Sequence, residues 1–183
     1  MNSIELKDDR ITLRPLRMSD ALEVFLAVEE SMPSLRPWMP WAYPGYSIVD
    51  SEGWLKSSVA GWKEGTAYEF AITDSKDGSF IGGIGLNHIN KIDKVANLGY
   101  WVRSSRQNQG VAATAAKLLI QFGINDLKLN RIEILAAAEN LASRKTAEKA
   151  GGIQEAILRH RIVLPDKVHE AVLFSIVPSD LSA

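Results

Sequence analysis

The stretch RQNQGVAATAAKLL, residues 106–119, places a short uncharged polar loop directly before a helix of small residues. A helix N-terminus leaves backbone N–H groups unpaired and carries partial positive charge, so it binds a phosphate without a basic side chain. Gly110 lets the backbone approach such a ligand closely, and the following alanines leave the approach open. We therefore predict a pyrophosphate cradle. The alternative is that Gly110 only permits a turn and the alanines only pack a helix on a sheet.

Two better-known phosphate-binding patterns are missing from this stretch. No Gly-Lys-Ser/Thr follows the glycine, so the loop is not a P-loop, and the spacing is not the Gly-x-Gly-x-x-Gly dinucleotide fingerprint. The glycine-rich IGGIG of residues 81–85 lies within a strand pattern and leads into no helix, so we expect no phosphate site there.

The elements around this stretch follow from hydrophobic periodicity and turn residues. We predict strands at residues 11–16, 68–73, 80–87, 95–103, 131–137, 153–162 and 167–177, and helices at residues 19–31, 49–63, 110–125 and 141–150. Four prolines between residues 33 and 44 predict an aromatic loop rather than a helix. Strands come first as hairpins and later alternate with helices, which favours a mixed α+β sheet in one domain, residues 1–183, with its core at about 11–177.

Composition narrows the possible partners. The 183 residues carry a net charge of −1 and no cysteine. This charge gives no global attraction to nucleic acid or anionic lipid, and the missing cysteines exclude disulfides, zinc–thiolate sites and a cysteine nucleophile. No apolar run has the length of a signal peptide or a membrane span. We expect a cytoplasmic protein with no metal, no nucleic-acid partner and no membrane partner.

Four segments carry a family resemblance. Q-x-x-G-x-A at residues 107–112, directly after LGYWV and before a helix, resembles the acetyl-coenzyme A signature of the GNAT superfamily of N-acetyltransferases. Arg14 in ITLRPLRMSDA, LNRIE at residues 129–133, and EN-x-x-S followed by EK-x-G at residues 139–151 are similar to the RimJ/RimL group, which acetylates protein N-termini. The similarity covers about residues 11–177 in order.

The resemblance implies that acetyl-coenzyme A (acetyl-CoA) binds in a V-shaped gap between two neighbouring strands of a mostly antiparallel sheet flanked by helices. The pantetheine arm would pair with the strand that carries Tyr100, and the pyrophosphate would meet the cradle backbone. The implied cofactor-binding residues are Trp101, Val102, Gln107, Asn108, Gln109, Gly110, Val111, Ala112, Ala113 and Asn140. Residues 151–153, Gly-Gly-Ile, depart from the group, which commonly has an aromatic residue after the glycine.

Asn140 and Ser143 stand on the first turn of the helix predicted at residues 141–150. The resemblance implies that Ser143 lies near the thioester sulfur, as a candidate proton donor, and that Asn140 lies near the pantetheine amides. From the residues alone, Asn140 is also a good helix N-cap, and this alternative stays open. Many GNAT enzymes use a tyrosine as the acid; no tyrosine follows Tyr100, which favours a serine or a water.

Acyl transfer to an amine needs a neutral nucleophile. At pH 7 an α-amine is roughly 10–20% neutral and an unperturbed lysine roughly 0.04%, so an N-terminal substrate needs little base catalysis. Glu69 is the candidate base or water-ordering group, since it faces opposite to Tyr68 and Phe70 in its strand. The alternative is a solvated carboxylate.

Trp38, Trp41 and His88 are predicted to line the acceptor pocket. The alternatives are that the tryptophans only cover the core and that His88 is a surface residue. A run of basic residues lies beside Ser143 and consists of Arg144, Lys145 and Lys149. One of them could contact the coenzyme A 3′-phosphate; the alternative is that the run is only a solvated helix face.

The function predicted from these observations is acetyl-CoA-dependent N-acetylation of a protein N-terminus, by direct transfer because no cysteine is present. A homodimer is a further expectation. Three alternatives stay open, namely acetylation of a small amine or amino acid, a non-catalytic coenzyme A sensor of the same fold, and a nucleotide-binding domain that uses the same helix terminus for another phosphate.

Overall fold

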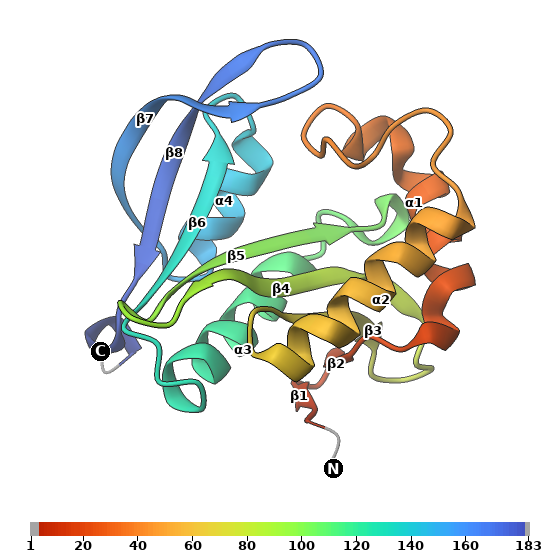
Figure 1. Ribbon diagram of the computed structural model, residues 1–183, viewed down its shortest axis with the longest axis horizontal. Coiled ribbons are helices and arrows are strands. Elements are labelled where there is room, and N and C mark those ends of the chain that lie inside the picture. Colours follow the sequence, from red (N-terminus) through yellow and green to blue (C-terminus); the bar gives the residue numbers. More distant parts are fainter. Residues whose placement is uncertain (1–3, 182–183) are drawn as a thin grey trace.

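The computed structural model describes residues 4–181 and contains a mixed α+β arrangement around one eight-stranded sheet. The strand order is β1-β2-β3-β4-β5-β6-β8-β7, and only β5 and β6 pair in parallel (Figure 1). The strands are β1 (Leu6–Lys7), β2 (Ile11–Pro15), β3 (Tyr68–Asp74), β4 (Phe80–Asn90), β5 (Val95–Val102), β6 (Arg131–Ala137), β7 (Ile153–Val163) and β8 (Val168–Ile176). The predicted fold class, a mostly antiparallel α+β sheet flanked by helices, is confirmed.

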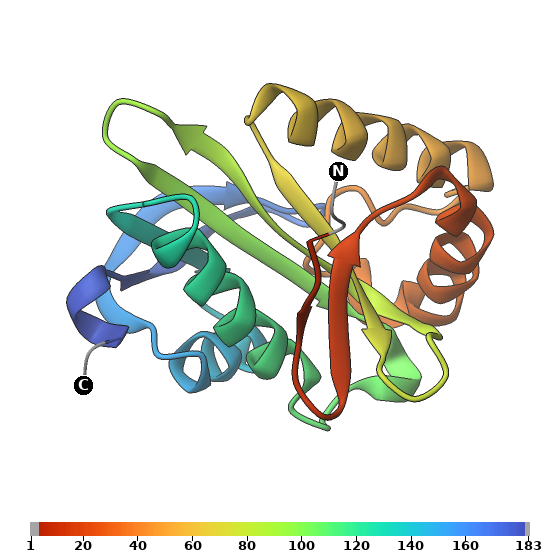
Figure 2. The ribbon, with the colours of Figure 1, turned by 90° about the horizontal axis from the view of Figure 1, so that it is seen from below.

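Four α-helices cover the two faces of the sheet (Figure 2). They are α1 (Ala21–Leu35), α2 (Ile48–Glu64), α3 (Val111–Asn125) and α4 (Leu141–Lys149). Helices α1 and α2 pack on one face around Leu55 and Val28, while α3 packs on the other face around Phe70 and Leu119. These side chains are almost completely buried, and burial of each stabilises the fold by about 1.5–3 kcal/mol.

The sheet opens between its two parallel strands. β5 and β6 pair only where Val95–Asn97 lie beside Arg131–Glu133, and beyond this point they diverge (Figure 1). Each arm stays paired on its outer side, because β4 follows β5 to Val102 and β8 follows β6 to Ala137. The predicted V-shaped splay is therefore present, and no strand within residues 4–181 pairs with the inner edge of β5 after Asn97.

Several predicted boundaries were wrong. Helix α1 continues to Leu35 through Pro33, whereas it was expected to stop near Ser31. The proline is tolerated because it is exposed, as is Glu29, whose carbonyl oxygen lies one turn earlier and can bond to water in place of the missing N–H. Leu22 and Leu26 face solvent, although their helical spacing suggested burial. The short strand β1 was not predicted.

Arg14, part of the family resemblance, has a structural role. Its guanidinium donates two hydrogen bonds to the Asp20 carboxylate, at 2.8 and 2.9 Å. Asp20 is buried and also accepts a hydrogen bond from the Arg17 backbone N–H at 2.8 Å. This charge-assisted pair fixes the corner between β2 and α1. Within residues 4–181 no helix has the length and apolar character needed to cross a bilayer.

Candidate active site

A cavity of about 550 Å³ lies where the sheet splays, and residues from both arms line it. Leu98–Trp101 of β5 form one wall, and Ile134–Ala137 of β6 form the other. The N-terminal turn of α4 closes one end, while α2 and the aromatic loop between α1 and α2 cover the opposite end. The cavity therefore meets the unpaired edge of β5 on one side and a cluster of aromatic rings on the other.

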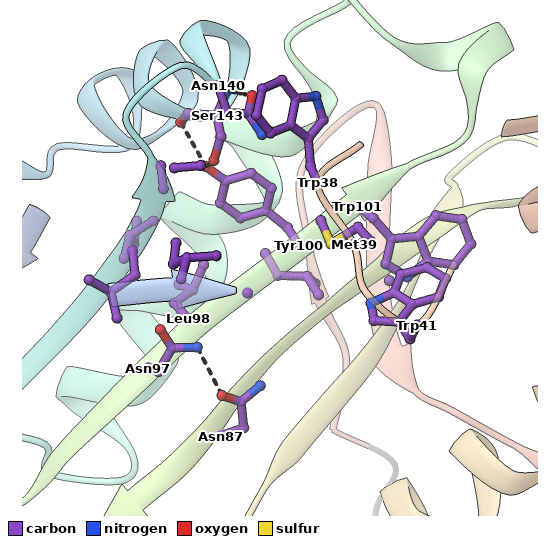
Figure 3. A pocket seen from close by; sticks show the side chains of 18 of the residues that line it. Trp38, Met39, Trp41, Asn87, Asn97, Leu98, Tyr100, Trp101, Asn140 and Ser143 are labelled. Atoms are coloured by element: carbon purple, nitrogen blue, oxygen red, sulfur yellow. Dashed lines mark hydrogen bonds between the residues drawn. The ribbon is translucent and has the colours of Figure 1, made fainter. Parts of the chain in front are cut away.

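Ser143 and Tyr100 meet across the splay (Figure 3). The Tyr100 hydroxyl donates to the Ser143 carbonyl oxygen at 2.9 Å and lies 3.2 Å from Ser143 Oγ. Burial raises the pKa of Tyr100 above its ordinary value, while the Ser143 and Thr146 hydroxyls act in the opposite direction. The phenol is therefore protonated at neutral pH, so the cavity holds two adjacent hydroxyl groups. The sequence had indicated only one of them, because β5 was expected to contribute backbone here.

Asn140 holds this turn in place. Its Oδ1 accepts a hydrogen bond from the Ser143 backbone N–H at 3.0 Å, which confirms the capping role left open from the sequence. Asn140 also lines the cavity, so the cap and a contact with a bound ligand are compatible.

Glu69 projects into the cavity from β3. Asn87 Nδ2 donates to Glu69 Oε1 at 3.3 Å, and Asn97 Nδ2 donates to Asn87 Oδ1 at 2.9 Å. The three side chains form a polar chain across β3, β4 and β5. Burial raises the pKa of Glu69, and the Asn87 hydrogen bond opposes this shift. Glu69 is half-buried and is held by Asn87, so it differs from the freely solvated carboxylate of the alternative.

The glycines of IGGIG make room for these side chains. A Cβ atom at Gly85 would lie 2.0 Å from Glu69 Oε2. A Cβ atom at Gly83 would lie 2.7 Å from both Trp101 Nε1 and Trp54 Cη2. Neither contact is possible between non-bonded atoms, so a side chain at either position would displace these groups. The segment lies within β4, as its strand pattern predicted, and Gly83 and Ile84 also line the cavity as its floor.

Six aromatic side chains line the cavity besides Tyr100. The aromatic loop, α2 and β5 contribute Trp38, Trp41, Tyr43, Tyr46, Trp54 and Trp101. Trp41 and Trp101 meet edge to face, with ring centroids 5.7 Å apart (Figure 3). The structure thus brings Trp38 and Trp41 to the cavity, as the acceptor-pocket prediction requires. His88 is not brought there; it is exposed on β4, with a φ of 49° where the β4–β5 register shifts.

The predicted cradle follows the free end of β5. Gly110 is the N-cap of α3 with a φ of 77°, and Asn108 has a φ of 59°. Gln107 Nε2 donates to the Val102 carbonyl oxygen at 3.0 Å, which ties the loop to β5. The backbone N–H groups of residues 108–113 find no acceptor within residues 4–181. The donor set is what a pyrophosphate requires, so the residues present are compatible with acetyl-CoA.

Two arginines approach the coenzyme side, and the sequence had indicated only one of them. Arg10 donates to the Gln109 carbonyl oxygen at 3.2 Å and to Thr114 Oγ1 at 2.8 Å, across almost 100 residues of chain. Arg144 donates to the Ala138 carbonyl oxygen at 3.1 Å, and its Nε atom is buried without a hydrogen-bond partner. Lys145 and Lys149 are exposed. No spacing rule relates Arg10 to the cradle, so sequence reasoning missed it.

His169 lies outside the cavity but beside the turn that carries Asn140. Its Nδ1 is 2.9 Å from Glu139 Oε2, and its Nε2 is 2.8 Å from Asp166 Oδ1. Asp166 and then Glu139 raise the pKa of His169 above its ordinary value. The imidazole, which is buried, therefore links the β7–β8 turn to the loop before α4. Within residues 4–181 no three His, Asp or Glu side chains are grouped to hold a metal ion.

Comparison with known proteins agrees with this geometry. Residues 10–153 match a family model described as an acetyltransferase (GNAT) domain. The ribosomal-protein-serine acetyltransferase of Escherichia coli (strain K12) is 27% identical over 171 residues, which cover 87% of this chain and 94% of that protein.

Two solved structures share the fold. RimL, a ribosomal L7/L12 α-N-protein acetyltransferase in complex with coenzyme A, superposes with a TM-score of 0.89 at 19% identity, over 95% of this chain and 98% of that chain. The microcin C7 self-immunity acetyltransferase MccE, in complex with acetyl-CoA and AMP, superposes with a TM-score of 0.86 at 24% identity, over 93% of each chain.

Proposed function

We propose, from the premise that this chain belongs to the GNAT family of acetyl-CoA-dependent N-acetyltransferases, that its acceptor is the α-amino group of a protein N-terminus. The observation that carries the proposal is the cavity at the splay. It joins the half-buried carboxylate of Glu69 on β3 to a hydroxyl pair, Tyr100 on β5 and Ser143 on α4. A base and a proton donor thus face one space that opens on the unpaired edge of β5.

The residues have distinct roles in this proposal. The unpaired backbone of β5 and the amides of residues 108–113 bind and orient acetyl-CoA, which supplies an activated thioester. Glu69 accepts the proton that the amine loses, directly or through one ordered water. Ser143 Oγ or the Tyr100 hydroxyl donates a proton to the departing thiolate. Because the chain has no cysteine, the acetyl group passes directly to the amine.

An α-amine suits this site better than a lysine. Burial raises the pKa of Glu69, which makes it a better base near neutral pH. An α-amine still needs far less base catalysis than a lysine side chain, since the pKa of an α-amine lies near 7.7–8.0. The Escherichia coli relative is named for a ribosomal-protein acceptor, and RimL for an α-N-protein acceptor. A ribosomal-type N-terminus acetylated in the cytoplasm is therefore the specific form of the proposal.

The test is release of free thiol from acetyl-CoA by the purified chain, with N-terminal peptides, lysine peptides with blocked N-termini, polyamines and free amino acids as acceptors. We expect release that depends on a free α-amine. Ser143→Ala should slow release while acetyl-CoA binding, measured by calorimetry, is kept. Val49→Ala, a change at an exposed residue outside the cavity lining, is the control. Acetyl-CoA binding without release for any amine would instead indicate a sensor.

A further inference from the structure

We infer that the acceptor is an N-terminal peptide whose first side chain is aromatic or large and apolar, with no carboxylate or phosphate close to the amine. This inference rests on the proposed function and names the substrate class of the same site. It follows from three properties of the acceptor end of the cavity: its ring types, its exposure and its charge.

The ring types distinguish the cavity from the core. Four of the five tryptophans and three of the four tyrosines of the chain line the cavity, but none of the five phenylalanines does. Phenylalanines are instead found in the core, where Phe70, Phe80 and Phe174 are almost completely buried. Tryptophan and tyrosine rings each carry one polar atom, so they suit a surface that contacts water when the site is empty and a ligand when it is occupied. The distribution therefore indicates a binding surface rather than an extension of the core.

The rings are also partly free. Trp41 is 38% exposed and Tyr43 is 43% exposed, although each touches another aromatic ring. The Trp41 and Trp101 rings meet edge to face at 61°; Trp101 is buried, so the exposed surface of this pair belongs to Trp41. A flat apolar side chain placed against the exposed rings would bury area that is now in contact with water. A serine or alanine side chain is too small to cover it.

The charge of the lining is negative. Asp50 and Glu69 are the two carboxylates, and no lysine, arginine or histidine lines the cavity within residues 4–181. Hydrogen bonds from Tyr43 and Ser47 lower the pKa of Asp50, which therefore stays ionised at neutral pH. An incoming ammonium group is attracted by this charge and by the aromatic faces.

The same charge disfavours free amino acids. The carboxylate of an amino acid lies two bonds from its amine, so binding the amine beside Glu69 would also bring a second negative charge close to it. A peptide replaces this carboxylate by a neutral amide. Because no cation lines the cavity to bind a carboxylate, the site favours a peptide over the free amino acid, which the sequence left open as an acceptor.

The experiment compares the kcat/KM for thiol release over a matched series. Peptides X-Ala-Gly-Gly-Ser with X as Phe, Leu, Ser or Ala test the side chain, while phenylalanine and phenylalaninamide test the carboxylate. We expect Phe to exceed Ser by about tenfold or more and phenylalaninamide to exceed phenylalanine by a similar factor. Trp41→Leu and Trp38→Leu should lower the Phe to Ser ratio without changing acetyl-CoA affinity, whereas Val49→Ala should leave the ratio unchanged.

The contrary outcomes are distinct from one another. A Ser or Ala peptide that equals the Phe peptide would overturn the inference and leave the proposed function intact. Turnover of 2-phenylethylamine but of no peptide would overturn the peptide acceptor while supporting the selection of aromatic amines. No thiol release with any amine would overturn the proposed function itself. A Phe to Ser ratio that is unchanged in both folded tryptophan variants, with folding checked by thermal midpoint, would overturn the assignment to these rings.

Discussion

In the proposed function, the coenzyme end and the acceptor end of the site recognise their ligands by different means. At the coenzyme end, backbone N–H groups of residues 108–113 provide the donors, while the Gln107 side chain is used to hold the loop to β5. At the acceptor end, every group that distinguishes one ligand from another is a side chain, delivered by β3, β5, α2 and the aromatic loop. Backbone recognition tolerates sequence change; side-chain recognition does not. Substitutions at the two ends should therefore affect different kinetic constants.

Replacing the base should have the largest effect. Glu69→Gln keeps the shape of the side chain but removes its proton-accepting capacity, so kcat should fall by about 10²- to 10³-fold with unchanged acetyl-CoA affinity. Since burial raises the Glu69 pKa, wild-type activity should be lost as pH falls through this raised value. At pH values below the Glu69 pKa, log kcat/KM of the wild type should rise with pH at a slope of about 2, because both Glu69 and the amine must lose a proton. In the variant only the amine does so, and the slope should be about 1. Glu170→Gln, an exposed change outside the cavity, should match wild type.

A second change tests whether the floor of the cavity positions that base. Gly85→Ala introduces a Cβ atom that collides with the Glu69 carboxylate, so kcat should fall by about 10- to 100-fold. Gly53→Ala in α2 is the matched control, because a Cβ atom there meets nothing within 4 Å. In the Glu69→Gln background, Gly85→Ala should add little to the loss. A full additional loss in that background would show that Gly85 acts on the fold rather than on Glu69.

At the coenzyme end the expected effect is on KM. Gly110→Ala strains a backbone with a φ of 77° but meets no atom within 4 Å, so the KM for acetyl-CoA should rise by about 5- to 10-fold while kcat changes less than about twofold. Gly78→Ala carries the same strain, with a φ of 75° and open space, in the β3–β4 turn. An equal rise in KM for both variants would mean that strain in general, rather than the cradle, is responsible.

Arg10 should contribute a smaller, salt-dependent part of coenzyme affinity. Arg10→Gln removes an exposed charge that bonds to Gln109 and Thr114, so the KM for acetyl-CoA should rise by about threefold at low salt and by less at high salt. Steady-state kinetics at two ionic strengths measure this. Arg161→Gln, an exposed change on β7, controls for net charge, and an identical effect there would rule out a local role.

His169 offers the smallest effect, on stability rather than activity. The pKa of His169 is raised in the folded chain. Its contribution to the free energy of unfolding is therefore complete below the unfolded-state pKa of about 6.5, and it is lost as pH rises through the folded-state pKa. Glu139, Asp166 and, beside Glu139, Lys167 are the charged groups that set this balance. Urea unfolding of wild type and His169→Gln at several pH values should show a smaller loss of stability with rising pH in the variant. Parallel pH curves would contradict this.

The contrast between the two ends also explains what the sequence could predict. The fold class and the cradle loop depend on patterns that are local in the chain, such as alternation in strands and a glycine before a helix, whereas the splay was implied by the family resemblance. Trp38, Trp41, Ser143 and Glu69 were predicted and line one cavity. Asn140 shows that one residue can satisfy two interpretations, since it caps α4 and lines the cavity.

What the sequence missed depends on contacts between distant strands. Tyr100 was placed correctly on its strand, but its hydroxyl meets Ser143 only because the sheet splays. Asn87 reaches Glu69, and Asn97 reaches Asn87, only through the β3–β4–β5 register. His88 was expected in the pocket from its nearness to the end of a strand, and the register shift after Asn87 leaves it in solvent instead. Pro33 was expected to end α1, and its exposed position in the last turn explains why it does not.

The most direct test of the account is to locate the acetyl group by mass spectrometry after reaction with a peptide that carries a free Phe N-terminus and one internal lysine. The account predicts acetylation of the α-amine and almost none of the lysine, with the product lost in Glu69→Gln. Acetylation of the lysine, or equal product from wild type and Glu69→Gln, would contradict it.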